Sequence, residues 1–440
     1  MQKTIWLSIL CILLNAWPGK KVMAQEFVDL KYENYDYGPF VGAVRFHVDG
    51  LRTSFPITDL AGSSRLLVSF DDLDGEVRDY YYTIIHCDRD WHPSELNQME
   101  YLDGYSEERI LDFQFSAKTL EDYTRYQFTI PNQSIRWTKS GNYLLVVYEK
   151  DNDYYPVLSR RFIVAERVIP VTPRLTRVSQ PSKMRTHQEF DFVANFENFP
   201  LRNPQQDIKA VIMQNGRWDT AIDGLPPQFV LGNELRYDYQ NKIVFPAMKE
   251  FRFIDLRNLR YPSQNIAQVE RMPNRWEVTL LKDRPRDGQP YIEYEDLNGG
   301  FIIENQEQSN ELAADYAQVL FTFDAAEPFY DKDIYLMGAF TNWQTDERYK
   351  MAYNNAVNGY VLKLPLKQGF YNYAYGLMPA SDGQPKSRDK EEPEEEVQPD
   401  FSLTEGNFFE TENNYLILLY YHPFGARYDQ VVGFVQFSTN

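Results

Sequence analysis

Short apolar segments bounded by turn residues dominate the chain after Gln25. Valine, isoleucine, phenylalanine and tyrosine recur in short runs that glycine, proline, asparagine and aspartate interrupt. No long segment repeats apolar residues at the spacing of an amphipathic helix, whereas the short runs are typical of strands. The 32 tyrosines and 29 phenylalanines suit the half-buried faces of pleated sheets. The pattern therefore predicts an all-β protein.

The strand pattern is clear in the region that ends near Ala165. A strand at 66–70 is followed by the turn signal Asp74-Gly75 and by a second strand at 80–85, which predicts a hairpin. Ser140-Gly141 precedes a strand at 142–148, and a strand at 160–164 closes the region. We expect residues 25–165 to form a first β-sandwich domain.

Chain length and later breaks predict two further domains in tandem. A chain of 440 residues suggests roughly three domains of about 100 to 150 residues. We expect a second sandwich at 166–305, with strands at 189–193, 208–213 and 276–281. A third is expected at 306–440, with strands at 319–323, 334–338, 415–421 and 431–437. Its acidic segment 388–400 contains Glu391–Glu396 and favours a mobile loop, with an acidic docking site as the alternative.

The first 24 residues have the pattern of a signal peptide. Lys3 precedes an apolar run at 5–14, and Ala24 offers a small residue for cleavage, so the mature chain is expected to begin near Gln25. No later stretch reaches the roughly 20 apolar residues of a membrane-spanning helix, and membrane insertion is not expected. The strands are also not uniformly spaced as in a membrane barrel.

The net charge and the number of cysteines restrict the partners and the disulfide bonds that this protein can have. Removal of Lys3, Lys20 and Lys21, with no acidic residue lost, takes the formal charge from -19 to -22, which disfavours nucleic acid and anionic lipid as partners. Cys11 follows Leu10, where a lipoprotein signal needs a small residue, and cleavage would remove it. Cys87 then remains alone, so no internal disulfide is expected.

The motif from His86 to His92, which includes Cys87, is the best candidate for metal binding or nucleophilic catalysis. Imidazole, thiol and carboxylate groups bind zinc or activate nucleophiles. A strand directs successive side chains to opposite faces, however, which separates these groups. Asp71-Asp72-Leu73-Asp74-Gly75 resembles part of a calcium loop, but Phe70 stands at the first ligand position, which favours a turn. No catalytic residue, metal or cofactor is therefore predicted.

Four tryptophans are the candidates for binding a partner. They lie beside polar residues, and tryptophan is enriched at binding hot spots. The alternative is a core tryptophan with a local hydrogen-bond partner. The four are Trp91, Trp137, Trp218 and Trp343.

The third region resembles the early-set immunoglobulin-like sandwich of glycogen-binding modules. The resemblance lies in Gly338-Ala339-Phe340-Thr341-Asn342-Trp343 and in the Gly-aromatic strand at 366–373. It departs at Thr341, where those modules usually have asparagine, and it lacks a second sugar-stacking tryptophan. A secreted polysaccharide-binding protein is the alternative function that this resemblance implies.

Taken whole, the sequence is similar to the type IX secretion system plug protein family of the Bacteroidota, formerly described as a domain of unknown function. The residues that carry the similarity spread over nearly all of the mature chain: His86-Cys87-Asp88 with Trp91, Ser140–Leu145, Arg160-Arg161-Phe162, Gln214-Asn215 with Arg217-Trp218-Asp219, Glu250-Phe251-Arg252, Asp296 with Asn298-Gly299, Lys367-Gln368-Gly369, and Glu412-Asn413 with Tyr415.

This resemblance implies a non-enzymatic periplasmic protein, peripherally attached to the outer membrane through its partner. The partner would be the outer-membrane translocon barrel of type IX secretion. The protein would bind the periplasmic mouth of that barrel and seal its pore. A rigid rod of β domains, offering edges and loops to another protein, would suit such a role.

Overall fold

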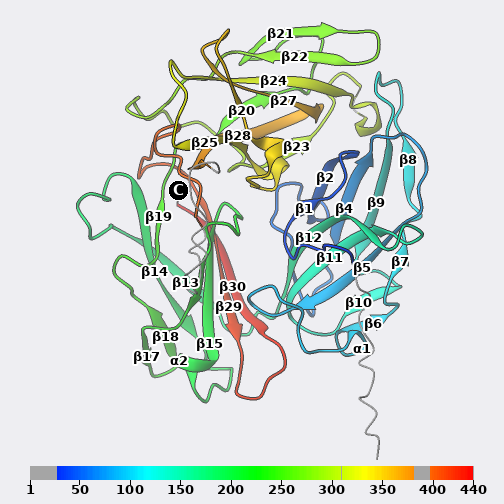
Figure 1. The fold of residues 1–440 in the computed structure, drawn as a ribbon. Coiled ribbons are helices and arrows are strands. Elements are labelled where there is room, and N and C mark those ends of the chain that lie inside the picture. The colour runs from blue at the N-terminus through cyan, green and yellow to red at the C-terminus, as the bar shows by residue number, and fades with distance from the viewer. Residues whose placement is uncertain (1–26, 309, 381–396, 440) are drawn as a thin grey trace, which may run out of the picture.

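Two β-sheets packed face to face form each of three lobes in the computed structural model (Figure 1). The structure describes residues 27–308, 310–380 and 397–439. The predicted signal peptide at 1–24 and residues 388–396 of the acidic segment lie outside the described residues. The prediction of an all-β fold built from sandwiches is confirmed, since helices are limited to single turns.

Lobe 1 comes from the chain up to Ala165. Its first sheet has the order β1 (Tyr35–Asp36), β12 (Tyr155–Ala165), β11 (Gly141–Glu149), β5 (Tyr80–Cys87) and β7 (Glu108–Arg109), with β3 (Ile57–Asp59) beside β12. Its second sheet has the order β2 (Val41–Val48), β4 (Leu66–Asp72), β9 (Thr124–Ile130) and β8 (Phe113–Phe115). The helical turn α1 (Gln98–Tyr101) precedes a small pair of β6 (Leu102–Gly104) and β10 (Ile135–Trp137).

Lobe 2 combines a central part of the chain with its C-terminal hairpin. One sheet has the order β13 (Val171–Thr176), β14 (His187–Asn195), β18 (Glu234–Tyr237) and β17 (Phe229–Leu231), with β19 (Val244–Pro246) beside β14. The other has the order β16 (Ile222–Leu225), β15 (Ile208–Gln214), β29 (Asn414–Tyr421) and β30 (Gln430–Ser438). The turn α2 (Pro204–Asp207) leads into β15.

Lobe 3 contains the strands between these two parts of lobe 2. One sheet has β20 (Arg252–Asp255), β28 (Gly369–Pro379) and β23 (Phe301–Ile303), with β25 (Lys332–Met337) beside β28. The other has the order β21 (Ile266–Arg271), β22 (Trp276–Leu280), β24 (Tyr316–Asp324), β27 (Gly359–Lys367) and β26 (Ala352–Asn354). Three 3-10 turns complete the lobe: η1 (Glu311–Ala313), η2 (Ala339–Thr341) and η3 (Glu347–Tyr349).

Strand pairing divides the chain differently from the boundary expected at residue 305. β29 pairs with β15 from Ile208↔Tyr421 to Gln214↔Tyr415, so the last hairpin belongs to lobe 2. β22 pairs in parallel with β24, so the strand expected in the second domain belongs to lobe 3. Lobe 3 is thus an insertion within lobe 2. Runs of apolar residues indicate where strands lie, but they do not indicate which distant strand each one pairs with.

The turn at Asp74-Gly75 does not close the hairpin that the sequence predicted. Gly75 has a φ of 72°, and its amide donates to the carbonyl of Asp72, so a turn is present. The flanking strands belong to different sheets, however, because β4 pairs with β2 and β9 while β5 pairs with β11 and β7. The connection crosses from one layer of the sandwich to the other.

The lobes pack against one another around a common centre and do not form the expected rod (Figure 1). Between lobes 1 and 2, the outer faces of two sheets share an apolar cluster that includes Ile163, Leu144, Leu418 and Met213. β30 also continues along lobe 1, where the amide of Glu166 donates to the carbonyl of Val431 at 2.7 Å. Burial between lobes fixes their relative positions and makes the body compact.

No helix among the described residues is long and apolar enough to cross a membrane.

Candidate functional site

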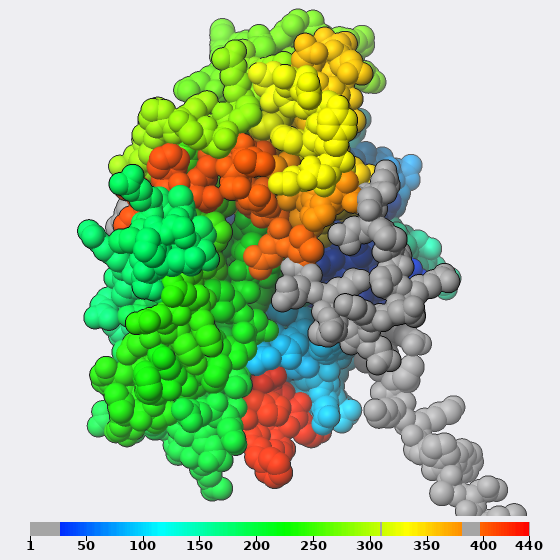
Figure 2. All heavy atoms as spheres, turned by 60° about the vertical axis from the view of Figure 1, so that its left-hand side comes forward, coloured from blue at the N-terminus to red at the C-terminus, as the bar shows by residue number. Residues whose placement is uncertain are grey.

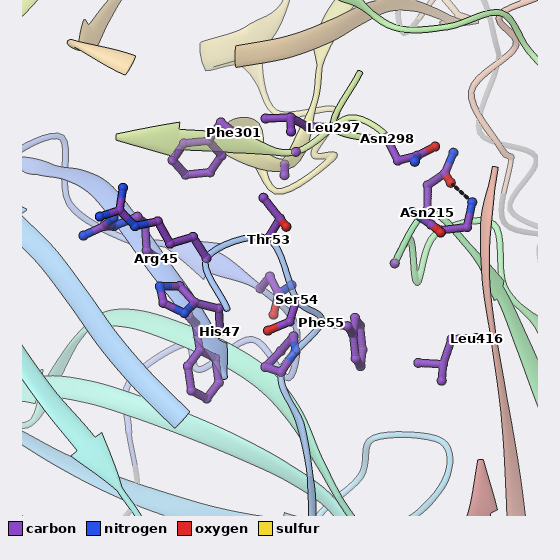
Figure 3. A pocket seen from close by; sticks show the side chains of 18 of the residues that line it. Arg45, His47, Thr53, Ser54, Phe55, Asn215, Leu297, Asn298, Phe301 and Leu416 are labelled. Carbon is purple, nitrogen blue, oxygen red and sulfur yellow. Dashed lines mark hydrogen bonds between the residues drawn. The ribbon is translucent and has the colours of Figure 1, made fainter. Parts of the chain in front are cut away.

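A cavity of about 370 Å³ lies where the three lobes meet (Figure 3). Lobe 1 supplies β2 and the following turn, with Arg45, His47 and Phe55; lobe 3 supplies Phe301, and lobe 2 supplies Asn215. Clefts of this size that combine apolar walls with a few polar groups are typical of ligand sites. The cavity depends on lobe 3 being inserted within lobe 2, which brings residues far apart in the sequence to one place. The spacing of residues in the sequence therefore did not indicate it.

Arginine and amide side chains dominate the polar part of this cavity. Arg45, Arg52, Arg160 and Arg161 line it, and no aspartate or glutamate is found among its described lining residues. Arg160 is neutralised by Asp36 at 2.6 Å. Arg161 donates to the carbonyl of Tyr32 and lies against aromatic rings. The wall is therefore cationic in a protein whose total formal charge is -19.

Glu311 balances part of this positive charge from just outside the cavity. Its carboxylate lies 2.8 Å from Arg45, 3.4 Å from Arg52 and 2.6 Å from Arg125. Although burial favours the neutral form, Arg45 and Arg125 lower the pKa of Glu311 to about 2. Three guanidinium groups thus share one fully ionised carboxylate.

The candidate motif at His86 and Cys87 is a packing feature of β5. The His86 ring donates from Nε2 to the carbonyl of Ser140 at 3.1 Å and accepts at Nδ1 from Ser94 at 2.9 Å. Burial lowers the pKa of His86 to about 4. Cys87 points to the opposite face, into the cluster between lobes 1 and 2, where burial raises the pKa of its thiol well above the usual range.

The structure does not bring these groups together as a metal or catalytic site. The side chain of His92 is 77% exposed and lies 3.7 Å from Asp88. Over the described residues, no group of three or more histidine, cysteine, aspartate or glutamate side chains is arranged to hold a metal ion. His86 and Cys87 point to opposite faces of β5, whereas Asp88 and His92 lie in the turn after the strand.

Trp91 and Trp218, two of the four predicted binding residues, meet between lobes 1 and 2. Their rings form an edge-to-face pair with centroids 4.9 Å apart. The guanidinium of Arg161 lies 4.4 Å from the Trp91 ring and 5.5 Å from the Trp218 ring. Trp91 is buried and Trp218 is half-buried. This cluster holds the two lobes together.

The other two tryptophans also face the interior. Trp137 is buried in the core of lobe 1, with its ring 5.6 Å from that of Phe162. Trp343 is half-buried at the junction of lobes 2 and 3, where the guanidinium of Arg217 lies 4.5 Å from its ring. Its edge approaches Gly299 so closely that a Cβ there would clash. All four tryptophans thus pack against other parts of this chain, but the indole nitrogens of Trp91 and Trp218 have no hydrogen-bond partner among the described residues, unlike the core tryptophan of the alternative.

Lobes 1 and 3 are joined by a buried polar network that the sequence did not reveal. Lys367 at the end of β27 forms an ion pair with Asp71 of β4, and Tyr316 donates to the same carboxylate at 2.7 Å. Asp315 also accepts from the amide of Leu120 at 2.7 Å. We expected Asp71 in a turn with other acidic residues, and no local pattern around it indicates a partner almost 300 positions away.

Two exposed apolar side chains lie on the elements through which the C-terminal hairpin contacts lobe 1. Phe424 at the hairpin tip is 102% exposed, and Met99 of α1 is 90% exposed. Arg427 forms an ion pair with Glu100, which anchors the hairpin beside α1. Figure 2 shows the red hairpin tip beside light-blue residues of lobe 1. Phe424 was not among the candidates predicted from the sequence, although its place between Pro423 and Gly425 is a signal for an aromatic at a turn.

The fold and part of the sequence match known proteins. Residues 41–166 match the family model described as the type 9 secretion system plug protein 1st domain. A crystal structure of a hypothetical protein from Parabacteroides merdae is similar, with 30% identity and a TM-score of 0.86 over 93% of this chain and 100% of that chain. Native alpha-2-macroglobulin from Escherichia coli, spanning domains NIE-MG1, matches at 9% identity and a TM-score of 0.17 over 47% of this chain and 90% of that chain, which carries no argument. No curated protein matches.

The family match lies on lobe 1, and the relative of 30% identity extends the similarity over the three lobes. Lobe 1 also contains the motifs at His86, at Ser140 and at Arg160 on which the resemblance was based. The chain belongs to the type 9 secretion system plug protein family.

Proposed function

We propose that this protein is a non-enzymatic subunit of type IX secretion that binds the periplasmic mouth of the outer-membrane translocon barrel and seals its pore. The match of residues 41–166 to the plug protein family carries the proposal. The family is of an accessory kind, and no catalytic family matches the chain. The role is mechanical, so it requires a body that keeps its shape against a larger partner.

The contacts between lobes support such a stiff body. Lobes 1 and 2 share an apolar cluster, lobes 1 and 3 share the buried pair of Lys367 and Asp71, and Trp343 of lobe 3 packs on Arg217 of lobe 2. Each lobe therefore contacts both others, which opposes hinge motion between them. Three lobes that all contact one another keep a fixed shape, which a protein that seals a pore requires. Domains joined only in a row would be free to move relative to one another.

We assign to the barrel the end of the molecule that carries the exposed side chains of Phe424 and Met99. Exposed apolar side chains that cluster on a soluble surface mark interaction sites. The ion pair of Arg427 with Glu100 holds the hairpin tip in place, so little entropy is lost when a partner covers it. The four tryptophans named from the sequence pack against other parts of this chain and do not form this face.

The protein is assigned to the periplasm, attached to the outer membrane through its partner. This location requires export, which the predicted signal peptide at 1–24 provides. The competing function, polysaccharide binding at Trp343, has less support because Arg217 covers one face of the indole that a sugar would need.

Deletion of the gene tests the proposal. The deletion strain is expected to admit small toxic solutes that the parent excludes, because the translocon pore stays open. Full-length protein is expected to restore the barrier, whereas Phe424→Ser restores it only in part. Tyr330→Ser is the matched control, since Tyr330 is 82% exposed on lobe 3. An unchanged barrier in the deletion strain, with secretion intact, contradicts the proposal.

A further inference from the structure

His47 lines the cavity between the lobes, and one of its ring nitrogens has no hydrogen-bond partner among the described residues. The residue is 4% exposed, and its Nε2 atom is buried without a hydrogen-bond partner in the described structure. Its Nδ1 atom lies 2.9 Å from the carbonyl of Val48, which can only accept, so Nδ1 carries the proton. Burial, aided by Arg45 and Arg52, lowers the pKa of His47, which keeps the ring neutral. Nε2 therefore offers a lone pair to a donor.

The same cavity has more positive charge than its surroundings neutralise. Two lining arginines, Arg45 and Arg52, share the carboxylate of Glu311 with Arg125, which lies outside the cavity. Arg52 contributes the longest of these contacts, at 3.4 Å, and its side chain is 52% exposed. A guanidinium in this position forms strong paired hydrogen bonds with a carboxylate. The excess of cations predicts a negatively charged ligand.

The apolar part of the wall adds a preference for an organic ligand. Phe46, Phe55 and Phe301 line the cavity together with Leu297 and Leu416. Figure 3 shows the side chains of lobe 3 opposite His47 and Phe55 of lobe 1, with Leu416 of lobe 2 at the other side. A volume of about 370 Å³ admits a molecule of the size of a monosaccharide.

We propose that this cavity binds a small hydroxylated carboxylate, whose anionic group lies beside Arg45 and Arg52 and whose hydroxyl donates to Nε2 of His47. The three polar contacts come from lobe 1, and the walls that lobes 2 and 3 contribute enclose the rest of the ligand. The inference concerns a ligand site and does not depend on the translocon as partner.

Three hydroxylated carboxylates serve as probes: D-glucuronate, D-gluconate and L-lactate. D-Glucose lacks the carboxylate, and cyclohexanecarboxylate lacks the hydroxyls. With the full mature chain, at least one hydroxylated carboxylate is expected to raise the unfolding temperature at millimolar concentration. Each control compound is expected to bind about tenfold or more weakly, because one of the two polar interactions is missing. Absence of any effect from all three probes overturns the proposal.

Nitrogen NMR of protein labelled at histidine identifies the contact. The chain has five histidines, so each Nε2 signal can be assigned by single substitutions. The bound probe is expected to shift the Nε2 signal of His47 and to leave that of His187 unchanged. If the probe binds while the His47 signal stays in place, Nε2 holds water only and the proposal is wrong.

A pair of arginine variants tests the charge. Arg52→Gln is expected to weaken binding of the active probe about tenfold. Arg65→Gln is the matched control, because Arg65 is 56% exposed, pairs with Asp49 and does not line the cavity. Both positions are solvent-exposed, so both variants are expected to fold. Equal affinities of the two variants overturn the assignment of the anionic group to Arg52.

Discussion

The ammonium group of Lys367 forms an ion pair with the carboxylate of Asp71, and both side chains are almost completely buried between lobes 3 and 1. Tyr316 donates a hydrogen bond to the same carboxylate, and the ring of Tyr123 lies 3.8 Å from the Lys367 nitrogen. Burial of the ammonium lowers the pKa of Lys367. A charge that is costly to bury is thus present where lobes 1 and 3 meet. Its removal by substitution tests how much this ion pair contributes to stability.

Lys367→Met is expected to destabilise the protein by about 3 kcal/mol, because the carboxylate of Asp71 remains buried without a cation. The double variant Lys367→Met with Asp71→Asn removes both charges and is expected to lose less stability than the single variant. Urea denaturation followed by tryptophan fluorescence measures both. Additive losses in the double variant would show that the two groups do not act as a pair.

The sequence allowed strands to be predicted, but not the pairing between distant strands that builds the lobes. The strands at 208–213 and 415–421 were predicted almost to their ends, since apolar runs between turn residues indicate strands. Their pairing with each other was not predicted, because the whole of lobe 3 lies between them in the sequence and nothing local encodes a long-range register. The cavity and the ion pair of Lys367 with Asp71 both depend on this topology. They could therefore not be predicted from the sequence either.

Stability is expected to fall in mildly acidic solution through His86. Because burial lowers the pKa of this ring from 6.5 to about 4, the unfolded chain binds a proton between these pH values that the folded chain does not. The folded state therefore loses up to about 3 kcal/mol as the pH falls through this window. His86→Gln has no such titration, so its urea midpoint is expected to depend less steeply on pH. Parallel curves for the two proteins would refute this role.

Trp137→Ala is expected to reduce stability and leave partner binding unchanged. Trp137 packs in the core of lobe 1 beside Phe162, so truncation opens a cavity that costs about 3 kcal/mol or more. Urea denaturation measures the loss, and affinity for purified barrel is measured at a temperature where the variant stays folded. A loss of affinity without a loss of stability would favour a direct contact with the partner.

The thiol of Cys87 is expected to be unreactive in the folded protein. It is fully buried, and its surroundings raise its pKa, so little thiolate forms. A thiol reagent such as DTNB should label Cys87 only after unfolding in urea, at a rate that follows the unfolding transition. Rapid labelling of folded protein would instead indicate an accessible, activated cysteine.

The polar neighbours of the candidate tryptophans in the sequence did not indicate where their side chains lie in the fold. Trp91 and Trp218 stand beside polar residues such as Asp90 and Arg217, which suggested exposure. In the fold their rings meet across an interface within the chain, where Arg161 covers them. A surface between lobes and a surface for a partner protein have the same composition, so sequence alone does not separate them.

Affinity purification from gently solubilised outer membranes tests the central claim most directly. Tagged full-length protein is expected to retrieve a very large outer-membrane barrel of the type IX system. Phe424→Ser is expected to retrieve about tenfold less of it, whereas Tyr330→Ser retrieves as much as the parent protein. Retrieval of no barrel by the folded, exported parent protein would contradict the account.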